Sequence, residues 1–565
     1  MRRSAVLATV AVFTALALTG CGGASTPVSG AGAGAGAGDP AAAGAGTGGT
    51  VHFLLSSDYS HLDPVRGWDG GVNNFYRLIY RGLTTFGAGP GTEGTKVVPD
   101  LATTTGTPSD DNKTWTFTLK DDIFFEDGKP ITSEAVKFGV ERAWDPEAGI
   151  GSPYAKLLID APKDYKGPYV SGDLDTIETP DAKTVVFHLK KPYADFASAL
   201  VQPNFVPFPK GTGAADAFDS KPIASGPYKV ESYRRGASLK LVRNPHWKAA
   251  SDTVRAAKPD AFEFTFGLDG ATIDERMLAG QGADANAIAG AIQAATVARI
   301  QTPQIKERTL SGYMGCTTYM SLNTTKKELG DVRVRQAINY AVNKDTVVAG
   351  DGGTTLAVKA TSIQPPTIVG RVDYDPYPTD MAKAQQLLND AGLGGGFELT
   401  LDVRPVARQQ GMAVAIQEAL KPLKIDVKIN NIDTSTFYEV IGTPAQQHDA
   451  ALTGWCPDWL SGATFLPPLF DGRNIVAKGN SNLAQIDDEA INKRIDEIAE
   501  MTDIDAANAA YSELDKQIME KAPIVPLVYE KNVTVIGGNI AGAYLNDSFS
   551  GGIDLVSVGL KDPSK

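Results

Sequence analysis

Two hydrophobic patterns alternate along the chain from residue 51 onward. Apolar residues spaced three or four apart predict helices, and alternating or short continuous apolar stretches predict strands. The predicted helices cover residues 73–82, 133–144, 332–348, 381–390, 411–420, 486–501 and 506–520. The predicted strands cover residues 51–57, 115–120, 185–189, 239–243, 397–403, 425–429, 450–455 and 524–529. Because helices and strands are interspersed without an internal repeat, we expect an α/β protein.

The first 21 residues have the pattern of a secretory leader. Two arginines precede a mostly apolar run, residues 5–18, which has the length of a signal-peptide core and is too short for a spanning helix of about 20 residues. The small residues before Cys21 resemble the bacterial lipobox, in which the cysteine is acylated and becomes the mature N-terminus. We therefore expect a signal peptide over residues 1–20, export, and a lipid anchor at Cys21 on the extracytoplasmic face of the cell membrane. An ordinary secretory signal with a chance cysteine is the alternative.

Residues 21–50 are predicted to form a disordered tether. Apart from Cys21 they are almost entirely Gly, Ala, Ser, Thr and Pro, and such a segment buries too little apolar surface to offset its chain entropy. A flexible chain of this length has an end-to-end distance on the order of 30 Å, enough to lift a folded body off a lipid surface. A low-complexity tail without a role would show the same disorder.

The composition of the remaining chain argues against several classes of protein. The full chain, leader included, has a net charge of −13, which disfavours nucleic acid and anionic lipid as partners. The five histidines are far apart and lack HExxH spacing, and no P-loop is present, so we expect no metal, no cofactor and no ATP hydrolysis. No further stretch is apolar enough to span a bilayer, and the length implies two or more lobes.

Two cysteines remain besides Cys21, namely Cys316 and Cys456. In an exported protein, two such cysteines are more often bonded to each other than reactive. Two buried free thiols are the alternative.

Five sequence blocks resemble, in family order, those of the family 5 extracellular solute-binding proteins. They are WTFTLKDDIFFEDGKPITSEAVKFGVERAW at 115–144, PIASGPY at 222–228, LNTTKKELGDVRVRQAINYAVNKDTVV at 322–348, DMAKAQQLLNDAG at 380–392 and APIVPLV at 522–528. Members of this family are the binding components of ABC importers for peptides, dipeptides, nickel and some saccharides.

The resemblance implies a two-lobed, periplasmic-binding-protein-like α/β fold with an extra domain (class II, cluster C), whose hinge closes over the ligand. Domain I is expected at residues 51–90, 216–307 and 523–565, domain II at 91–215, and domain III at 308–522. Domains I and III are expected to face each other across the ligand cleft.

Residues 454–459 read GWCPDW and match the position where the family's oligopeptide-binding members carry Trp-Cys-x-Asp. The resemblance implies that Asp458 pairs with the α-amino group of the ligand and that Cys456 forms a disulfide with Cys316 inside domain III. A carboxylate suits an ammonium ion that loses its water, because charge-assisted hydrogen bonds are about twice as strong as neutral ones. Trp455 and Trp459 would offer flat apolar faces to ligand side chains. A turn or helix cap is the alternative role for Asp458.

The chain departs from these relatives where they hold the peptide carboxylate. No arginine or lysine occurs at residues 450–453, so Arg404, with Arg408 near it, is the nearest basic candidate. Solvated surface arginines are the alternative. On domain I, the loop 68–73, which holds Trp68, Asp69 and Asn73, corresponds to a segment lining the cleft in relatives, and residues 59–61, beginning with Tyr59, border it.

These features together predict a monomeric, lipid-anchored receptor that binds a peptide and delivers it to an ABC permease with its ATPase subunits. The resemblance implies that the peptide is an oligopeptide. We expect it not to be an enzyme. A receptor of the same fold for a saccharide, metal chelate or signalling molecule is the first alternative. An exported hydrolase on a lipid tether is the second.

Overall fold

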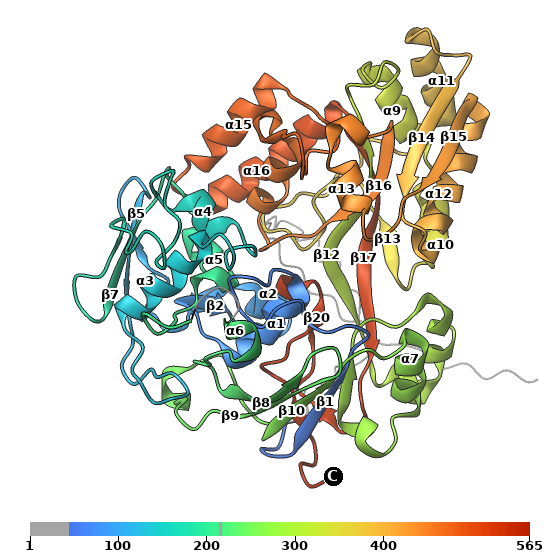
Figure 1. The fold of residues 1–565 in the computed structure, drawn as a ribbon. Helices are drawn as coiled ribbons and strands as arrows, with labels where there is room; N and C mark the ends of the chain where they lie inside the picture. The colour runs from blue at the N-terminus through green and yellow to red at the C-terminus, as the bar shows by residue number, and fades with distance from the viewer. Residues whose placement is uncertain (1–43, 214–216) are drawn as a thin grey trace, which may run out of the picture. The chain divides into compact units, whose positions relative to one another are not determined.

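The structure is a computed structural model, and it describes residues 44–213 and 217–565 (Figure 1). All of them belong to one compact unit, Pro40–Lys565. The predicted signal peptide, Cys21 and most of the predicted tether lie outside the described residues, as does the predicted domain boundary at residues 215 and 216. In the described ranges, no helix combines the length and the apolar character needed to cross a membrane.

A five-stranded sheet begins near the start of the described chain. Its strand order is β11-β1-β10-β9-β8, with β1 parallel to both of its neighbours. The strands are β1 (Thr50–Leu54), β8 (Tyr228–Arg234), β9 (Ser238–Arg243), β10 (Ala261–Thr265) and β11 (Ala287–Ala289). The core on this sheet also takes in the helix α1 (Gly70–Ile79) and buried side chains from residues 536–560. The C-terminal stretch therefore packs with the first strand of the chain.

A four-stranded antiparallel sheet, in the order β4-β5-β7-β6, has a core of its own. Its strands are β4 (Thr107–Pro108), β5 (Thr114–Thr118), β6 (Ile177–Glu178) and β7 (Thr184–His188). The helices of this region are α3 (Ser133–Glu141), α4 (Tyr154–Leu158) and α5 (Phe196–Ala199), whereas the short helix α2 (Thr92–Thr95) contacts the turn at residues 546–549. Trp115 and Phe117 alternate with polar residues on β5 and are both buried in this core, as the period of two in the sequence predicts.

A six-stranded mixed sheet occupies the C-terminal half, in the order β13-β17-β12-β16-β14-β15. Its strands are β12 (Thr309–Leu322), β13 (Ala357–Lys359), β14 (Phe397–Val403), β15 (Ile425–Asn431), β16 (Ala450–Trp455) and β17 (Ile524–Val535). The helices α9 (Val332–Ala341), α10 (Lys344–Asp351), α11 (Met381–Asp390) and α12 (Ala407–Leu420) share its core. A second core joins α14 (Leu466–Phe470), α15 (Glu489–Ala499) and α16 (Ile504–Glu520).

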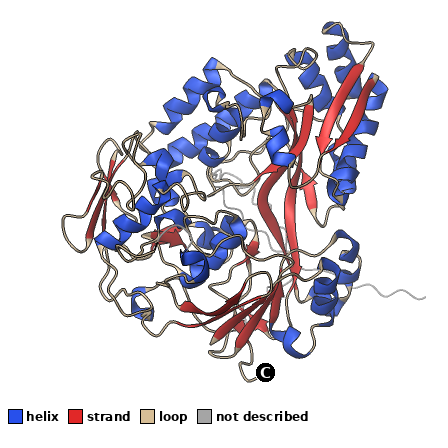
Figure 2. Cartoon of the chain, in the orientation of Figure 1, coloured by secondary structure: helices blue, strands red, loops and turns tan. Residues whose placement is uncertain are grey.

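The long strands β12 and β17 pair with each other and connect different cores (Figure 2). At one end of β12, Leu310 packs in the core of the five-stranded sheet, and at the other end Met320 packs in the core of the six-stranded sheet. The register of the pair shifts between Tyr313 and Thr317. A bulge of this kind bends a strand and changes its twist, so the two strands form an irregular crossing between the two regions.

The remaining elements are short. They are the strands β2 (Thr84–Phe86), β3 (Val97–Pro99), β18 (Ile540–Ala541), β19 (Leu545–Asn546), β20 (Gly552–Ile553) and β21 (Gly559–Leu560), and the helices α6 (Ala217–Ser220), α7 (Gly270–Ala279), α8 (Pro303–Lys306) and α13 (Phe437–Ile441).

The single helix predicted over residues 332–348 is wrong, because the structure has two helices there, α9 and α10. Val342 and Asn343 between them are extended, and the side chain of Asn343 accepts a hydrogen bond from the amide of Asp345, which caps α10. An asparagine that bonds its neighbouring backbone competes with helix continuation. The apolar spacing continues through the break, which explains why the pattern alone missed it.

Candidate ligand-binding site

Asp458 lies just after β16 and receives hydrogen bonds from segments that are far away in the sequence. The indole Nε1 of Trp68 donates to its Oδ1 over 2.9 Å, and the hydroxyl of Tyr154 donates to its Oδ2 over 2.6 Å. The side-chain amide of Gln202 donates to its backbone oxygen over 2.9 Å. Residues from the three predicted domains thus meet at one carboxylate.

The hydrogen bonds to Asp458 also bear on its alternative role as a cap. Both bonds to its carboxylate come from side chains, and no backbone amide of the described residues donates to it. A helix or turn cap accepts from nearby backbone amides, so the capping role does not fit this geometry.

The charge on Asp458 has no counter-charge among the described residues. Burial raises the pKa of its carboxyl to about 6, and the hydrogen bonds from Tyr154 and Trp68 oppose this shift. Both donors are neutral, and no basic side chain takes part. An ionised, partly desolvated carboxylate that is held only by neutral donors is suited to bind a cationic group.

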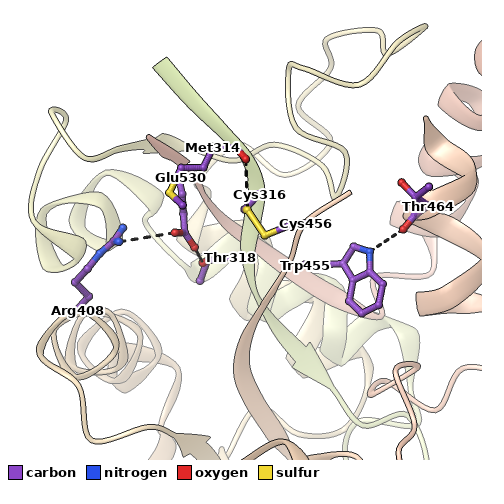
Figure 3. The surroundings of a disulfide bond; sticks show 8 residues. All are labelled: Met314, Cys316, Thr318, Arg408, Trp455, Cys456, Thr464 and Glu530. Carbon is purple, nitrogen blue, oxygen red and sulfur yellow. Dashed lines mark hydrogen bonds and ion pairs between the residues drawn. A yellow bond between two sulfur atoms is a disulfide. The ribbon is translucent and has the colours of Figure 1, made fainter. Parts of the chain in front are cut away.

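The two tryptophans beside Asp458 differ in their surroundings. The side chain of Trp459 is 2% exposed and packs edge-on against Tyr154, with ring centroids 4.6 Å apart, while its Nε1 donates to Asp195 over 2.5 Å. Trp455 is partly exposed and donates to the backbone oxygen of Thr464 over 2.7 Å (Figure 3). The predicted contact of both rings with ligand stays a prediction. In this structure Trp459 anchors the segment that carries Asp458 on the core of the four-stranded sheet.

Trp455 lines a small cavity at the end of β16. The cavity has a volume of about 170 Å³ and is lined in part by Tyr319, Tyr438 and Asn480. Trp455 is three residues before Asp458 in the sequence, and Asp458 itself is not among the residues that line the cavity.

A disulfide joins Cys316 to Cys456, which confirms the pairing expected from the resemblance and contradicts the free-thiol alternative (Figure 3). Cys316 lies at the register shift of β12, and the next residue, Thr317, pairs with Trp455 across the two strands. The bond therefore ties the turn that carries Asp458 to the crossing strand.

The residues predicted on the opposite side of the site lie around the start of α1. Asp69 caps this helix by accepting the amide of Val72 over 2.8 Å. Tyr59 stacks on Phe75 with ring centroids 4.4 Å apart, and burial raises the pKa of its phenol well above the usual value. The Oδ1 atom of Asn73 is buried and has no hydrogen-bond partner among the described residues. Contact of these side chains with ligand is still a prediction.

Of the three side chains that reach Asp458, Tyr154 and Gln202 were not predicted as site residues, and Trp68 was predicted only as part of the loop 68–73 and not as a partner of Asp458. Trp68 precedes the predicted Asp69, and Tyr154 begins α4 in the region of the four-stranded sheet. Their sequence separations from Asp458 are 390 and 304 residues. No periodicity or spacing links residues over such distances, so only the folded structure brings them together.

The two candidate arginines have different surroundings. Arg408 pairs with Asp351 over 2.6 Å and lies 3.8 Å from Glu530, so its charge is compensated by two acids (Figure 3). The guanidinium of Arg404 lies over Phe437 and Tyr438, at 5.4 and 5.6 Å from the ring centroids, and its buried Nε has no hydrogen-bond partner in the part of the chain that the structure describes. Arg404 therefore remains the better of the two candidates for a ligand carboxylate.

The chain belongs to the bacterial extracellular solute-binding proteins of family 5. The family's sequence profile (family 5, middle) matches residues 96–476. A solved structure, the clavulanic acid biosynthesis oligopeptide binding protein 2, is 31% identical with a TM-score of 0.87, over 92% of this chain and 96% of its own. The family and the α/β fold of periplasmic binding proteins, both expected from the sequence, are confirmed.

Relatives of this chain are named for different ligands. The glutathione-binding protein GsiB of Salmonella paratyphi A is 26% identical over 88% of this chain and 92% of its own length. The heme-binding protein A of Haemophilus influenzae is 26% identical over 78% of this chain and 80% of its own length. The ABC transporter-associated periplasmic binding protein DppA of Helicobacter pylori, solved with the peptide STSA, is 24% identical over 91% of this chain and 99% of its own, and its TM-score of 0.70 shows a shared fold.

Membership of the family decides the class of activity. The protein is an exported binding protein and not an enzyme, and it serves as the substrate-binding component of an ABC importer. The hydrolase alternative is therefore wrong. The ligand of this protein does not follow from membership of the family alone, because relatives of similar sequence identity are named for glutathione and for heme.

Proposed function

We propose that the protein is a lipid-anchored, monomeric receptor that binds peptides by their free amino terminus and delivers them to an ABC permease. The observation that carries the proposal is the carboxylate of Asp458, which is held by neutral donors from Trp68 and Tyr154 and has no cation beside it within residues 44–213 and 217–565. A ligand ammonium group would supply the missing charge.

The similarity to a protein named for oligopeptide binding supports a peptide ligand. The named ligand of a second group of relatives, glutathione, also carries a free amino group. In the proposed complex the ligand amine pairs with Asp458, and a side chain of the ligand enters the cavity beside Trp455. Arg404 is then the proposed contact for the far end of the ligand.

The proposal for the ligand class is tested by native mass spectrometry of protein purified without denaturation, followed by identification of whatever it releases. We expect peptides with unmodified amino termini. Release of a saccharide, a metal chelate or heme as the principal ligand would contradict the proposal and favour the alternative of a non-peptide receptor.

The lipid anchor is tested separately by Cys21→Ala. The variant should leave the membrane fraction and appear in the medium or the soluble fraction, with unchanged affinity for peptide, because the tether separates the anchor from the folded unit. The matched control is Ser25→Ala, four residues further along the tether, which should stay with the membrane. Retention of Cys21→Ala in the membrane fraction would show that Cys21 is not the anchor.

A further inference from the structure

The turn that carries Asp458 is held from outside the six-stranded sheet by two side chains that lie close together in the sequence. The side-chain amide of Gln202 donates to the backbone oxygen of Asp458 over 2.9 Å, and the carboxylate of Asp195 accepts a hydrogen bond from the indole of Trp459 over 2.5 Å. Asp195 immediately precedes α5, and Gln202 follows this helix. The region of the four-stranded sheet therefore holds two consecutive residues of the turn.

The side chain of Gln202 makes one hydrogen bond among the described residues, the bond to Asp458. It is 2% exposed, and its Oε1 atom is buried without a partner in the same part of the chain. A buried amide costs free energy unless it is hydrogen-bonded. The backbone oxygen of Asp458 receives no other hydrogen bond within the described ranges. This contact explains why a polar side chain occupies position 202.

Trp459 supplies the apolar part of the hold. Its ring packs in the core of the four-stranded sheet, although the residue follows β16 of the six-stranded sheet in the sequence. Inside the turn, the hydroxyl of Thr464 donates to the backbone oxygen of Trp459 over 2.9 Å, and the indole of Trp455 donates to the backbone oxygen of Thr464. Because the turn is bonded within itself, a hold on residues 458 and 459 fixes the position of the whole turn.

The same segment also supports a donor to the carboxylate of Asp458. Asn204, two residues after Gln202, donates its side-chain amide to the backbone oxygen of Ser152 over 3.1 Å. Ser152 lies two residues before Tyr154, whose hydroxyl donates to the carboxylate. Gln202 and Asn204 thus hold the backbone of Asp458 and the backbone next to Tyr154 in a fixed relation. Loss of the Gln202 amide should let the carboxylate shift relative to this donor.

We propose that Gln202 and Asp195 are positioning residues for ligand binding, which hold the turn of Asp458 in place around the bound ligand and slow its release. This inference rests on the proposed function, in which Asp458 binds the amino terminus of a peptide. Neither side chain needs to touch the ligand, because each acts through the turn. Losing a contact of the bound state weakens that state, and such losses appear mainly in the rate of dissociation.

Gln202→Met tests the inference, since methionine keeps the length of the side chain and removes the amide. Stopped-flow measurements give the rates for tetra-alanine, and calorimetric titration gives the affinities for tetra-alanine and its N-acetylated form. We expect tetra-alanine to dissociate about tenfold faster from the variant than from wild type, at a similar association rate. Displacement of the carboxylate should also reduce the preference for the free amine by about threefold or more. A general loss of stability would not change this preference, because both peptides meet the same folded protein.

Gln364→Met is the matched control. Gln364 is also buried, donates its side-chain amide to the backbone oxygen of Tyr511 over 3.2 Å, and has an Oε1 atom without a partner among the described residues. Its hydrogen bond ends on α16 and does not reach Asp458. The control should therefore release tetra-alanine at the wild-type rate and keep the preference for the free amine.

Asp195 is tested by a second pair of variants. Asp195→Asn keeps an oxygen that can accept the hydrogen bond of Trp459, and Asp195→Leu does not. The asparagine variant should release tetra-alanine close to the wild-type rate, and the leucine variant should release it faster, as Gln202→Met does.

Wild-type rates and an unchanged preference in Gln202→Met would overturn the inference. Faster release with an unchanged preference would overturn it as well, because the turn would then be loosened without displacement of the carboxylate. In both cases the proposed function survives as long as wild-type protein prefers the free amine. Wild-type protein without that preference, or without binding of either peptide, would overturn both.

Discussion

Two buried aspartates, Asp63 and Asp458, are stabilised in opposite ways. Both oxygens of Asp63 accept hydrogen bonds from the guanidinium of Arg142, at 3.2 and 2.5 Å, and both side chains are fully buried. Asp458 receives hydrogen bonds only from the neutral side chains of Trp68 and Tyr154. The fold thus compensates the first charge completely and leaves the second uncompensated. The difference separates a carboxylate that holds the structure together from one that is available to a ligand.

The largest expected effect on stability comes from Asp63→Asn. This change leaves Arg142 as an uncompensated buried charge, between Phe208 and Phe218, and breaking such a pair costs about 3–5 kcal/mol. Denaturant unfolding should show this loss, while the folded fraction should bind peptide as wild type does. Asp458→Asn is the control and should unfold close to wild type. Equal losses of stability in the two variants would remove the distinction between the two aspartates.

The disulfide should have the next largest effect. The bond closes a loop with a sequence separation of 140 residues, and a bond of this kind contributes about 2–4 kcal/mol. The free energy of unfolding of the double variant Cys316→Ser with Cys456→Ser should be lower by this amount, so the variant should unfold at a lower denaturant concentration. It should also bind peptide more weakly, because the turn of Asp458 is no longer tied to β12.

Two measurements check the account of the disulfide. Wild-type protein under reducing conditions should match the double variant in stability. Titration of denatured, unreduced protein should find neither Cys316 nor Cys456 as a free thiol. Unchanged stability of the double variant would show that the bond is dispensable for the fold.

A smaller effect is expected from pH. The carboxyl of Asp458 has a pKa raised to about 6, and a bound ammonium favours the ionised form. Below pH 6 the proton must leave before the cation binds, so the affinity should fall as pH is lowered, by up to about tenfold per unit. Neither Trp68 nor Tyr154 titrates in this range. A Kd that is flat from pH 7 to 5, or equally pH-dependent in Asp458→Asn, would contradict this account.

Much of the fold followed from local sequence patterns. The alternation at Trp115 and the spacing of apolar residues at 381–390 each correspond to an observed strand or helix. The strand β12 was not predicted, although it crosses between two cores. Its mixture of small, polar and aromatic residues reflects different surroundings at its two ends, and neither simple alternation nor a continuous apolar run describes it.

The candidate site followed from sequence only in part. The motif around Asp458 and the pairing of Cys316 with Cys456 could be read from the family resemblance. The donors to Asp458 could not, because Trp68 and Tyr154 come from remote segments. The sequence also could not separate the buried Trp459 from the partly exposed Trp455, since two nearby tryptophans carry the same hydrophobic signal whichever surface each one meets.

The central claim is that Asp458 binds the charged amino terminus of the ligand. Calorimetric titration of wild type and Asp458→Asn with tetra-alanine and with its N-acetylated form tests this claim most directly. Removing the charge of the protein, by Asp458→Asn, or that of the peptide, by N-acetylation, should cost about 2–5 kcal/mol of binding free energy. This corresponds to a roughly 30-fold or larger loss of affinity. The variant should no longer distinguish the two peptides. Wild-type protein that binds both peptides equally, or a variant that binds tetra-alanine as tightly as wild type, would contradict the account.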